Sequence, residues 1–287
     1  MTLGSVSILS NLLDGPWNNT FFENMMATQP EHTRHNIKDI METNNKSIIT
    51  MRVGFYSSLS LAILTLITFG FAMIAVPPAG PYCPGDCMSY PYPDILSYYP
   101  RDYYWMYMAV LQLLVYLIFI ISNHFNVLLE RRIFSFISVA FALISTSVLL
   151  ADYFLQFAVV PISVMKGETE GIALITQYNG RGVFVVLEEL GYLLMSISFL
   201  FLGLAFAVKN RLERTIRWIL IVPIVLTVFS FVFYSIKFGI DRNYRFEVAA
   251  ITINWLVIIV TGILISIYFK REIKLVNKKL GQTGIID

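Results

Sequence analysis

Six long apolar runs dominate this chain and constrain its fold more than any other feature. They cover roughly residues 48–76, 104–126, 133–164, 183–208, 217–239 and 247–269. A helix of about twenty apolar residues crosses the hydrocarbon core of a bilayer, where only internally satisfied backbones are tolerated. Of the 287 residues, 14% are charged, against about a quarter in soluble domains. The sequence therefore predicts an all-α, polytopic membrane helical bundle with six transmembrane helices.

The distribution of Lys and Arg predicts the orientation of the bundle. Fifteen of these residues fall on the side of the N-terminal segment, the turns at 127–132 and 209–217 and the C-terminal tail, against five on the other side. Cytoplasmic loops carry the excess of Lys and Arg. We therefore expect both termini in the cytoplasm and a multi-pass protein of the plasma membrane. Its expected parts are a cytoplasmic or interfacial segment (1–46), a transmembrane domain (47–270) and a basic cytoplasmic tail (271–287).

The compositions of the two terminal segments indicate lipid as their partner. Residues 1–30 contain no Lys or Arg, so they lack the basic start of a signal peptide, and we expect a dispensable leader or an interfacial segment. The tail "KREIKLVNKKLGQ" places five cations beside the last span, which favours attraction to anionic lipids. The orientation rule already accounts for these cations, so no nucleic acid is expected as a partner.

Two loops on the side opposite the termini have distinct compositions. Cys83 and Cys87 lie in a Pro-, Gly- and Tyr-rich loop, where a small-loop disulfide is the favoured interpretation. No histidine lies on that side, so a metal site is not expected, and no cofactor is predicted. The loop "KGETEGIALITQYNGRG", residues 166–182, has polar ends around an apolar centre. That pattern predicts a short helix or lid covering the polar residues described next.

Polar residues cluster at similar depth inside five of the six runs. Charged residues within membrane spans usually face the bundle interior or a water-filled cavity, and short carboxylate side chains cannot reach back to the interface as Lys does. These residues are the candidate ligand-binding set: Gln112, Asp152, Gln156, Glu188, Glu189, Tyr192, Tyr234, Lys237 and Asn254. Two interpretations stay open, a ligand site and a structural pairing such as Lys237 with Glu188 or Asp152. Only the first predicts a cavity.

The adjacent carboxylates Glu188 and Glu189 sharpen this expectation. Neighbouring residues on a helix diverge by about 100°, so both side chains cannot point at the same partner. We expect one to face the bundle centre and the other a neighbouring helix or water. At least one should lie within reach of Lys237, Asp152, Tyr192 or Asn254.

The sequence offers little support for an enzyme. The three histidines are His32, His35 and His124, all on the predicted cytoplasmic side, and no nucleophile elbow or phosphate-binding loop is present. The Glu pair invites comparison with intramembrane CAAX-type proteases, but Leu193 stands where their Arg would follow. An intramembrane acid–base enzyme remains the weakest alternative.

One segment carries a resemblance. Residues 152–201 contain "KGETEG", "TQYN" and "LEELGY", and they resemble a family of uncharacterised prokaryotic multi-pass membrane proteins of unknown function. The resemblance implies a membrane location and a six-helix fold, and nothing chemical. The leading functional hypothesis is a transporter, receptor or sensor with an outward-facing polar site for a small molecule. The favoured ligand carries positive charge or many hydrogen bonds. The alternative is a structural or partner-binding membrane protein whose buried polar layer only locks the bundle.

Overall fold

A computed structural model describes residues 31–75 and 78–282. The chain divides into two compact units, residues 1–47 and 48–287. The first contributes the beginning of a helix, and the second holds the bundle. Predictions for residues 1–30 and for the last five residues lie outside the described part of the chain. Within that part the secondary structure is helical, with no strand.

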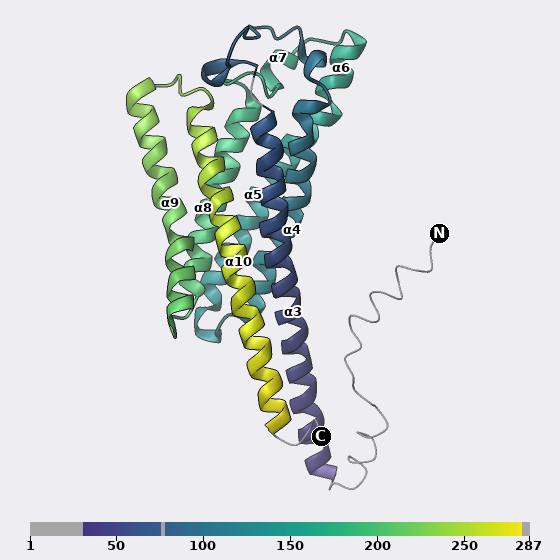
Figure 1. Cartoon of the computed structure of the whole chain (residues 1–287), viewed down its shortest axis with the longest axis vertical. Helices are drawn as coiled ribbons and strands as arrows, with labels where there is room; N and C mark the ends of the chain where they lie inside the picture. The colour runs from purple at the N-terminus through teal and green to yellow at the C-terminus, as the bar shows by residue number, and fades with distance from the viewer. Residues whose placement is uncertain (1–30, 76–77, 283–287) are drawn as a thin grey trace, which may run out of the picture. The chain divides into compact units, whose positions relative to one another are not determined.

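The second unit contains six long helices, of which α3 begins in the first unit (Figure 1). Their bounds are α3 Glu31–Ile74, α4 Tyr104–Asn126, α5 Arg132–Ala158, α8 Val183–Ala205, α9 Arg211–Phe238 and α10 Tyr244–Gln282. Each contains a window long and apolar enough to cross a membrane, and these are the six such helices among the described residues. The predicted all-α bundle of six spans is confirmed, and the chain is a multi-pass membrane protein.

Short helices fill the connections between the long ones. They are η1 Gly80–Tyr82, η2 Ile95–Tyr98, η3 Arg101–Tyr103, η4 Leu129–Arg131, α6 Val160–Lys166 and α7 Ile172–Ile175. The third apolar run is therefore divided, because α5 ends at Ala158 and α6 follows it. Pro161 lies in the first turn of α6. Proline lacks an N–H and clashes with the carbonyl four residues earlier, so one continuous helix is disfavoured at this point.

The connection between α8 and α9 is fixed by side chains that satisfy both helix ends. The guanidinium of Arg131 donates to the carbonyl oxygens of Leu204 and Phe206 at the end of α8. Asn210 caps α9 by accepting from the backbone N–H of Glu213. The Glu213 carboxylate in turn accepts from the N–H of residue 209. Helix ends leave backbone groups without partners, and these contacts supply them in a membrane-adjacent turn.

The closest helix pair, α5 with α8, is joined by hydroxyl groups and a glycine. Ser138 and Ser198 each donate to the other's backbone carbonyl, at 2.8 and 2.9 Å. Two turns along, Ser145 donates to the carbonyl of Gly191 at 2.7 Å. A Cβ on Gly191 would lie 2.5 Å from the Leu149 side chain, so a larger residue here would require Leu149 to shift. Small residues at helix interfaces let backbones approach closely in membranes.

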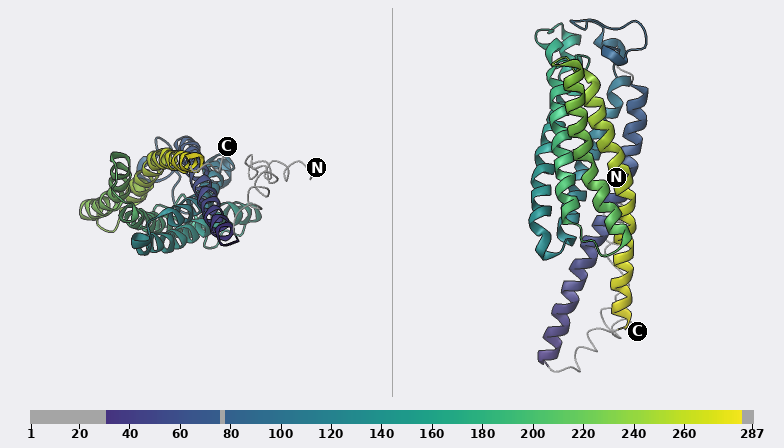
Figure 2. Two further views of the ribbon diagram at one scale, coloured as in Figure 1. Left: turned by 90° about the horizontal axis from the view of Figure 1, so that it is seen from below. Right: turned by 90° about the vertical axis from the view of Figure 1, so that its left-hand side faces the viewer.

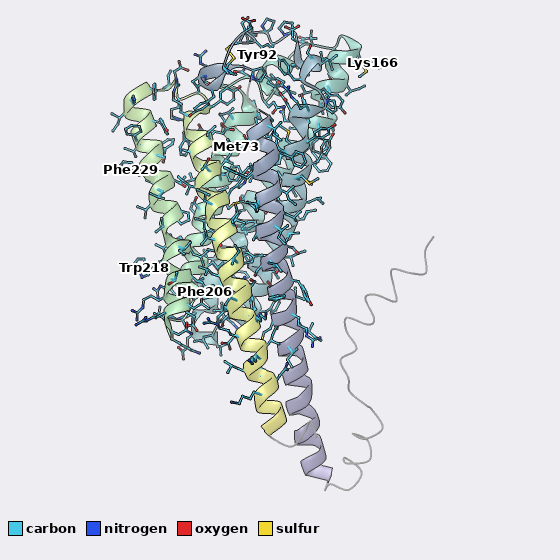
Figure 3. The ribbon with its side chains drawn as sticks, in the orientation of Figure 1. Met73, Tyr92, Lys166, Phe206, Trp218 and Phe229 are labelled. Atoms are coloured by element: carbon cyan, nitrogen blue, oxygen red, sulfur yellow. A yellow bond between two sulfur atoms is a disulfide. The ribbon has the colours of Figure 1, made fainter. Side chains whose placement is uncertain are left out.

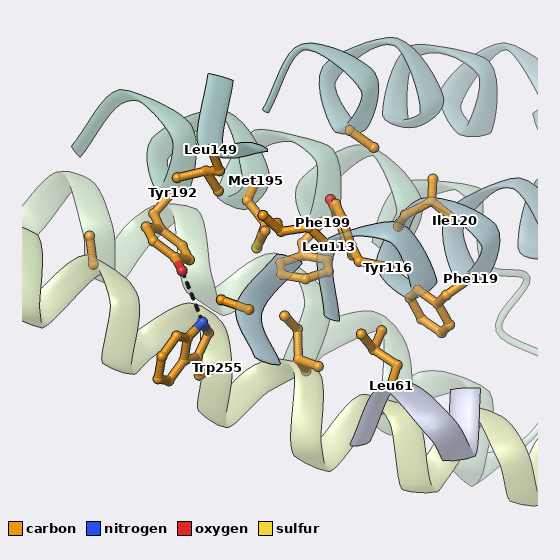
Figure 4. Close-up of a cluster of buried hydrophobic side chains, with 14 of the residues drawn as sticks. Leu61, Leu113, Tyr116, Phe119, Ile120, Leu149, Tyr192, Met195, Phe199 and Trp255 are labelled. Carbon is orange, nitrogen blue, oxygen red and sulfur yellow. Dashed lines mark hydrogen bonds between the residues drawn. The ribbon is translucent and has the colours of Figure 1, made fainter. Parts of the chain in front are cut away.

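The apolar core lies along this seam, between α4, α5, α8 and α10. Figure 4 shows its fully buried side chains, among them Tyr116, Phe199 and Trp255. On the far side of α10, Gly262 meets α3, where a Cβ would lie 2.7 Å from the Ser58 carbonyl oxygen. Helix α9 lies at the edge of the bundle (Figure 2), and its span is the least buried of the six.

One end of the bundle carries most of the connecting structure. We call it the disulfide end, formed by residues 78–103, 159–182 and 239–243, and it includes Tyr92 and Lys166 in Figure 3. Cys83 and Cys87 form a disulfide bond there. Whether this end faces away from the cytoplasm stays a prediction from the distribution of charge.

Candidate functional site

A cavity of about 300 Å³ opens at the disulfide end of the bundle. Helices α3, α4, α8 and α10 form its walls together with the segments around η1, η3 and α7. Seven aromatic side chains line it: Phe69, Tyr82, Trp105, Tyr178, Phe184, Tyr244 and Trp255. Two carboxylates, Asp102 and Glu247, complete the charged lining, and no Lys, Arg or His is among the described residues that line it. The site is therefore aromatic and acidic.

A chain of hydrogen bonds leads from the cavity wall into the interior. The indole of Trp255 can only donate, so the Tyr192 oxygen accepts from its Nε1 at 3.1 Å (Figure 4). The Tyr192 and Tyr153 hydroxyls lie 2.9 Å apart, and Tyr153 donates to Glu188 Oε1 at 2.8 Å. Each hydroxyl has one proton, and that of Tyr153 is donated to Glu188. The Tyr153 oxygen therefore accepts from Tyr192, so every hydrogen bond of the chain is donated in the direction from Trp255 to Glu188. The chain ends on a carboxyl group that is 0% exposed.

Glu188 also meets the second carboxylate of the site. Its carboxyl group interacts electrostatically with that of Glu247, which is 7% exposed and lines the cavity. The Oε2 atoms of both residues are buried without a hydrogen-bond partner. A hydrogen bond between two carboxyl groups forms only when one of them is protonated. The pair therefore has room for one proton that no other described group supplies.

The segment between α6 and α8 forms part of the cavity wall. Gln156 near the end of α5 donates to the carbonyl of Ile175 and accepts from the N–H of Gln177. The hydroxyl of Tyr244 on α10 donates to the carbonyl of Gln177 at 2.9 Å. Gln177 and Tyr178 line the cavity. The expectation that residues 166–182 lie over the polar residues agrees with these contacts, and α7 supplies the expected short helix.

Charges at the rim are paired, unlike the Glu188–Glu247 pair. Arg101 contacts Asp102 at 2.7 Å, and Arg242 contacts Glu189 at 3.1 Å. At the surface, the Arg181 guanidinium forms two hydrogen bonds with Asp241 and holds the pKa of that carboxyl below its usual value.

Burial also acts on the tyrosine beside Asp102. It raises the pKa of the Tyr178 hydroxyl well above its usual value, and the Asp102 charge adds to the effect. That hydroxyl therefore remains a hydrogen-bond donor at the cavity wall, directed at Asp102 at 3.5 Å.

Several residues of the predicted set do come together. Glu188 faces the interior, so the expectation that at least one glutamate of the doublet does so is confirmed. Tyr192 lies in the hydrogen-bond chain, and Asp152 is 1% exposed and interacts electrostatically with Glu188. Asn254 donates to the Tyr192 carbonyl and to Ser196.

Other predicted residues are placed differently. Glu189 turns to Arg242 as expected for its diverging direction, and Gln156 anchors the segment of residues 175–177. Gln112 is buried, with its Oε1 unpartnered. The described ring contacts of Tyr234 and Lys237 are with residues of their own helix, α9. Tyr234 packs against Phe233, and Lys237 lies over the rings of Phe233 and Phe238.

Lys237 is exposed, and within the described part of the chain it forms no ion pair with Glu188 or Asp152. A Lys pairing of the buried carboxylates is therefore not what the structure contains.

Sequence reasoning missed the residues on the cavity side of the network. They are Asp102, Tyr153, Tyr178, Glu247 and Trp255. A signal existed on the last run, because Glu247, Asn254 and Trp255 follow helical spacing and share one face. Glu247 was overlooked because it lies at the margin of the apolar run.

The site offers no arrangement typical of a metal centre. Within the described residues, no group of three or more His, Cys, Asp or Glu side chains is placed to hold a metal ion. Comparison of the chain with protein-family models, with curated proteins and with solved structures finds no match. The resemblance of residues 152–201 stays a prediction, and the class is that of a multi-pass α-helical membrane protein.

Proposed function

We propose that this protein binds an organic cation in the aromatic and acidic cavity, as a transporter, receptor or sensor whose site faces away from the cytoplasm. The favoured ligand is an amine or quaternary ammonium group attached to a small apolar body. The observation that carries the proposal is the lining itself: seven aromatic rings and two carboxylates around about 300 Å³.

The lining matches the chemistry of such a ligand. The face of an aromatic ring attracts a cation by about 0.5 to 2 kcal/mol, depending on desolvation. A cavity of this volume falls at the lower end of small-molecule sites, which are mostly apolar with a few polar groups. Trp105 and Trp255 supply the strongest faces, and Glu247 supplies the counter-charge. An anion would meet two carboxylates and no basic side chain in this lining.

The two carboxylates are not equivalent. Arg101 already neutralises Asp102, whereas Glu247 forms no ion pair with a basic side chain of the described residues. A buried charge without a partner is costly, and a cationic ligand would relieve that cost. Glu247 is therefore the proposed contact for the cationic group.

The alternative, a polar layer that only locks the bundle, fits one half of the polar residues. Ser196 on α8 lies within hydrogen-bonding distance of Thr227 on α9 and Asn254 on α10, all fully buried. These three side chains pack together and join three helices, as a structural layer requires. The residues around Glu247 instead border an open acidic cavity, which a purely structural layer does not require.

The test uses purified protein in lipid nanodiscs and isothermal titration calorimetry. The probes are tetramethylammonium, choline and benzyltrimethylammonium, with 3,3-dimethylbutan-1-ol as the neutral isostere of choline. At least one cation should bind, and the alcohol should not bind measurably. Glu247→Gln should weaken binding by about 10- to 100-fold, since a hydrogen bond or contact with a charged group contributes about 1.5 to 3 kcal/mol. Glu168→Gln, in the exposed loop, is the matched control. Failure of all three cations to bind refutes the proposal.

A further inference from the structure

The contact between Glu188 and Glu247 has a consequence for protons. Glu188 Oε1 accepts the hydroxyl of Tyr153, so that oxygen is satisfied. Its Oε2 has no partner, and neither has Oε2 of Glu247. Both atoms are buried, and the two carboxyl groups are close enough to interact electrostatically. One proton shared between the two carboxyl groups satisfies both.

The titratable groups around the pair provide no positive charge to replace that proton. From α5 these are Asp152 and Tyr153, from α8 Glu189 and Tyr192, from α10 Tyr244, and from η1 Tyr82. Every carboxyl in this set adds negative charge when ionised. The guanidinium of Arg242 forms its ion pair with Glu189 instead.

The hydrogen-bond chain from Trp255 cannot neutralise the pair either. Trp255, Tyr192 and Tyr153 each donate one proton in a fixed direction, and the chain delivers a single neutral donor to Glu188. Two ionised carboxylates in contact would repel each other strongly in a site of low dielectric. A proton or an external cation has to be present.

We propose that the Glu188–Glu247 pair holds one proton while the cavity is empty and releases it when an organic cation binds beside Glu247, so that one proton is exchanged for one cation. This inference rests on the proposed function and adds that cation binding is coupled to proton release. The proton passes from the pair through the cavity to water as the ligand's charge takes its place. The net charge of the site is the same before and after the exchange, so a charged ligand enters without adding charge to the membrane interior.

The exchange sets how affinity varies with pH. While the empty site is protonated and the occupied site is not, the apparent affinity rises about tenfold for each unit of pH, because one proton leaves per ligand. The same linkage makes the ligand drive proton release and the proton gradient drive ligand release, which is the thermodynamic requirement for exchange transport.

The first experiment measures the proton directly. Benzyltrimethylammonium has no titratable proton, so any proton released on its binding comes from the protein. Calorimetric titrations at one pH in buffers of different ionisation enthalpy should show release of one proton per cation bound in the wild-type protein. Glu188→Gln should still bind the cation, with proton release lost and affinity independent of pH. Binding without proton release in the wild type overturns the exchange and leaves the proposed function standing. Absence of binding overturns both.

The second experiment examines the empty site by infrared spectroscopy at neutral pH. All proteins carry Asp152→Asn, because Asp152 is a third buried carboxyl with an unpartnered oxygen and would give a band of the same kind. In this background the carbonyl band of a protonated carboxyl should be present without ligand, and adding benzyltrimethylammonium should remove it. Adding Glu188→Gln and Glu247→Gln together should abolish the band, whereas the control Glu189→Gln should retain it. A background spectrum without the band shows that the empty pair holds no proton, and a band that persists when both glutamates are replaced places the proton elsewhere. Either result overturns the inference, whatever the calorimetry shows.

Discussion

The hydroxyl of Tyr192 is the centre of the buried hydrogen-bond chain, and its removal gives a sharp test of that chain. Tyr192→Phe keeps the ring and deletes one oxygen. The Nε1 of Trp255 then loses its acceptor, and the Tyr153 oxygen loses its donor. Both groups are buried in the bundle, where water cannot replace the missing atom without entering the core.

The expected cost follows from two lost cross-helix contacts. Hydrogen bonds between membrane helices average about 0.6 kcal/mol and reach about 1.7, so two of them give about 1 to 3.5 kcal/mol. Unfolding of the purified protein in mixed micelles by increasing denaturing detergent measures the difference. Tyr56→Phe, on a half-exposed tyrosine of α3, is the control and should change the free energy of unfolding by less than about 0.5 kcal/mol.

A double-mutant cycle separates the hydrogen bond from other effects of the substitution. Tyr192→Phe and Trp255→Phe remove the same contact, so their combined cost should be smaller than the sum of the single costs by about 0.5 kcal/mol or more. Additive costs, or a Tyr192→Phe protein as stable as the Tyr56→Phe control, would refute the chain as described.

Three further predictions concern the frame and the ends of the bundle. Gly262→Ala should lower the free energy of unfolding by about 1 to 3 kcal/mol because its Cβ meets the α3 backbone, whereas Gly70→Ala, with open space around its Cβ, should not; equal effects in detergent unfolding would contradict the close crossing. Both native cysteines are in the disulfide, so Gln282→Cys provides a single free thiol, which an impermeant reagent should fail to label on intact cells; ready labelling overturns the predicted orientation. The pKa of Asp241 is lowered from 3.8, so its pairing with Arg181 is present at neutral pH and is lost only when the pH falls below 3.8. The Arg181 Nε resonance should shift in that pH range in the wild type and not in Asp241→Asn.

The apolar runs were sufficient to predict the spans because helix length in a membrane depends on local composition alone. The same reasoning predicted that Glu188 would be buried, since a carboxylate in lipid needs an inward partner. Its actual partners, Tyr153 and Glu247, could not be derived. They belong to other helices, and which residues meet depends on how each helix is rotated about its axis and on which helices are neighbours.

The rotation of α9 shows this limit most clearly. Thr227, Tyr234 and Lys237 follow one helical stripe in the sequence, and Tyr234 and Lys237 belong to the predicted ligand-binding set. In the structure Thr227 is buried while Lys237 is exposed, because α9 lies at the edge and touches the bundle mainly over its first half. Equal depth in the membrane did not imply equal access to the cavity.

The reciprocal serines of α5 and α8 determine which helices can move. Sliding these two helices past each other by one turn would break the Ser138–Ser198 bonds and the Ser145–Gly191 bond together, so they behave as one rigid body. The cavity depends on other contacts, because α3 and α10 supply most of its helical lining and meet through Phe69 and Trp255 as well as through Gly262. A change of shape on ligand entry would therefore fall on α3 and α10 while the α5–α8 body stays fixed.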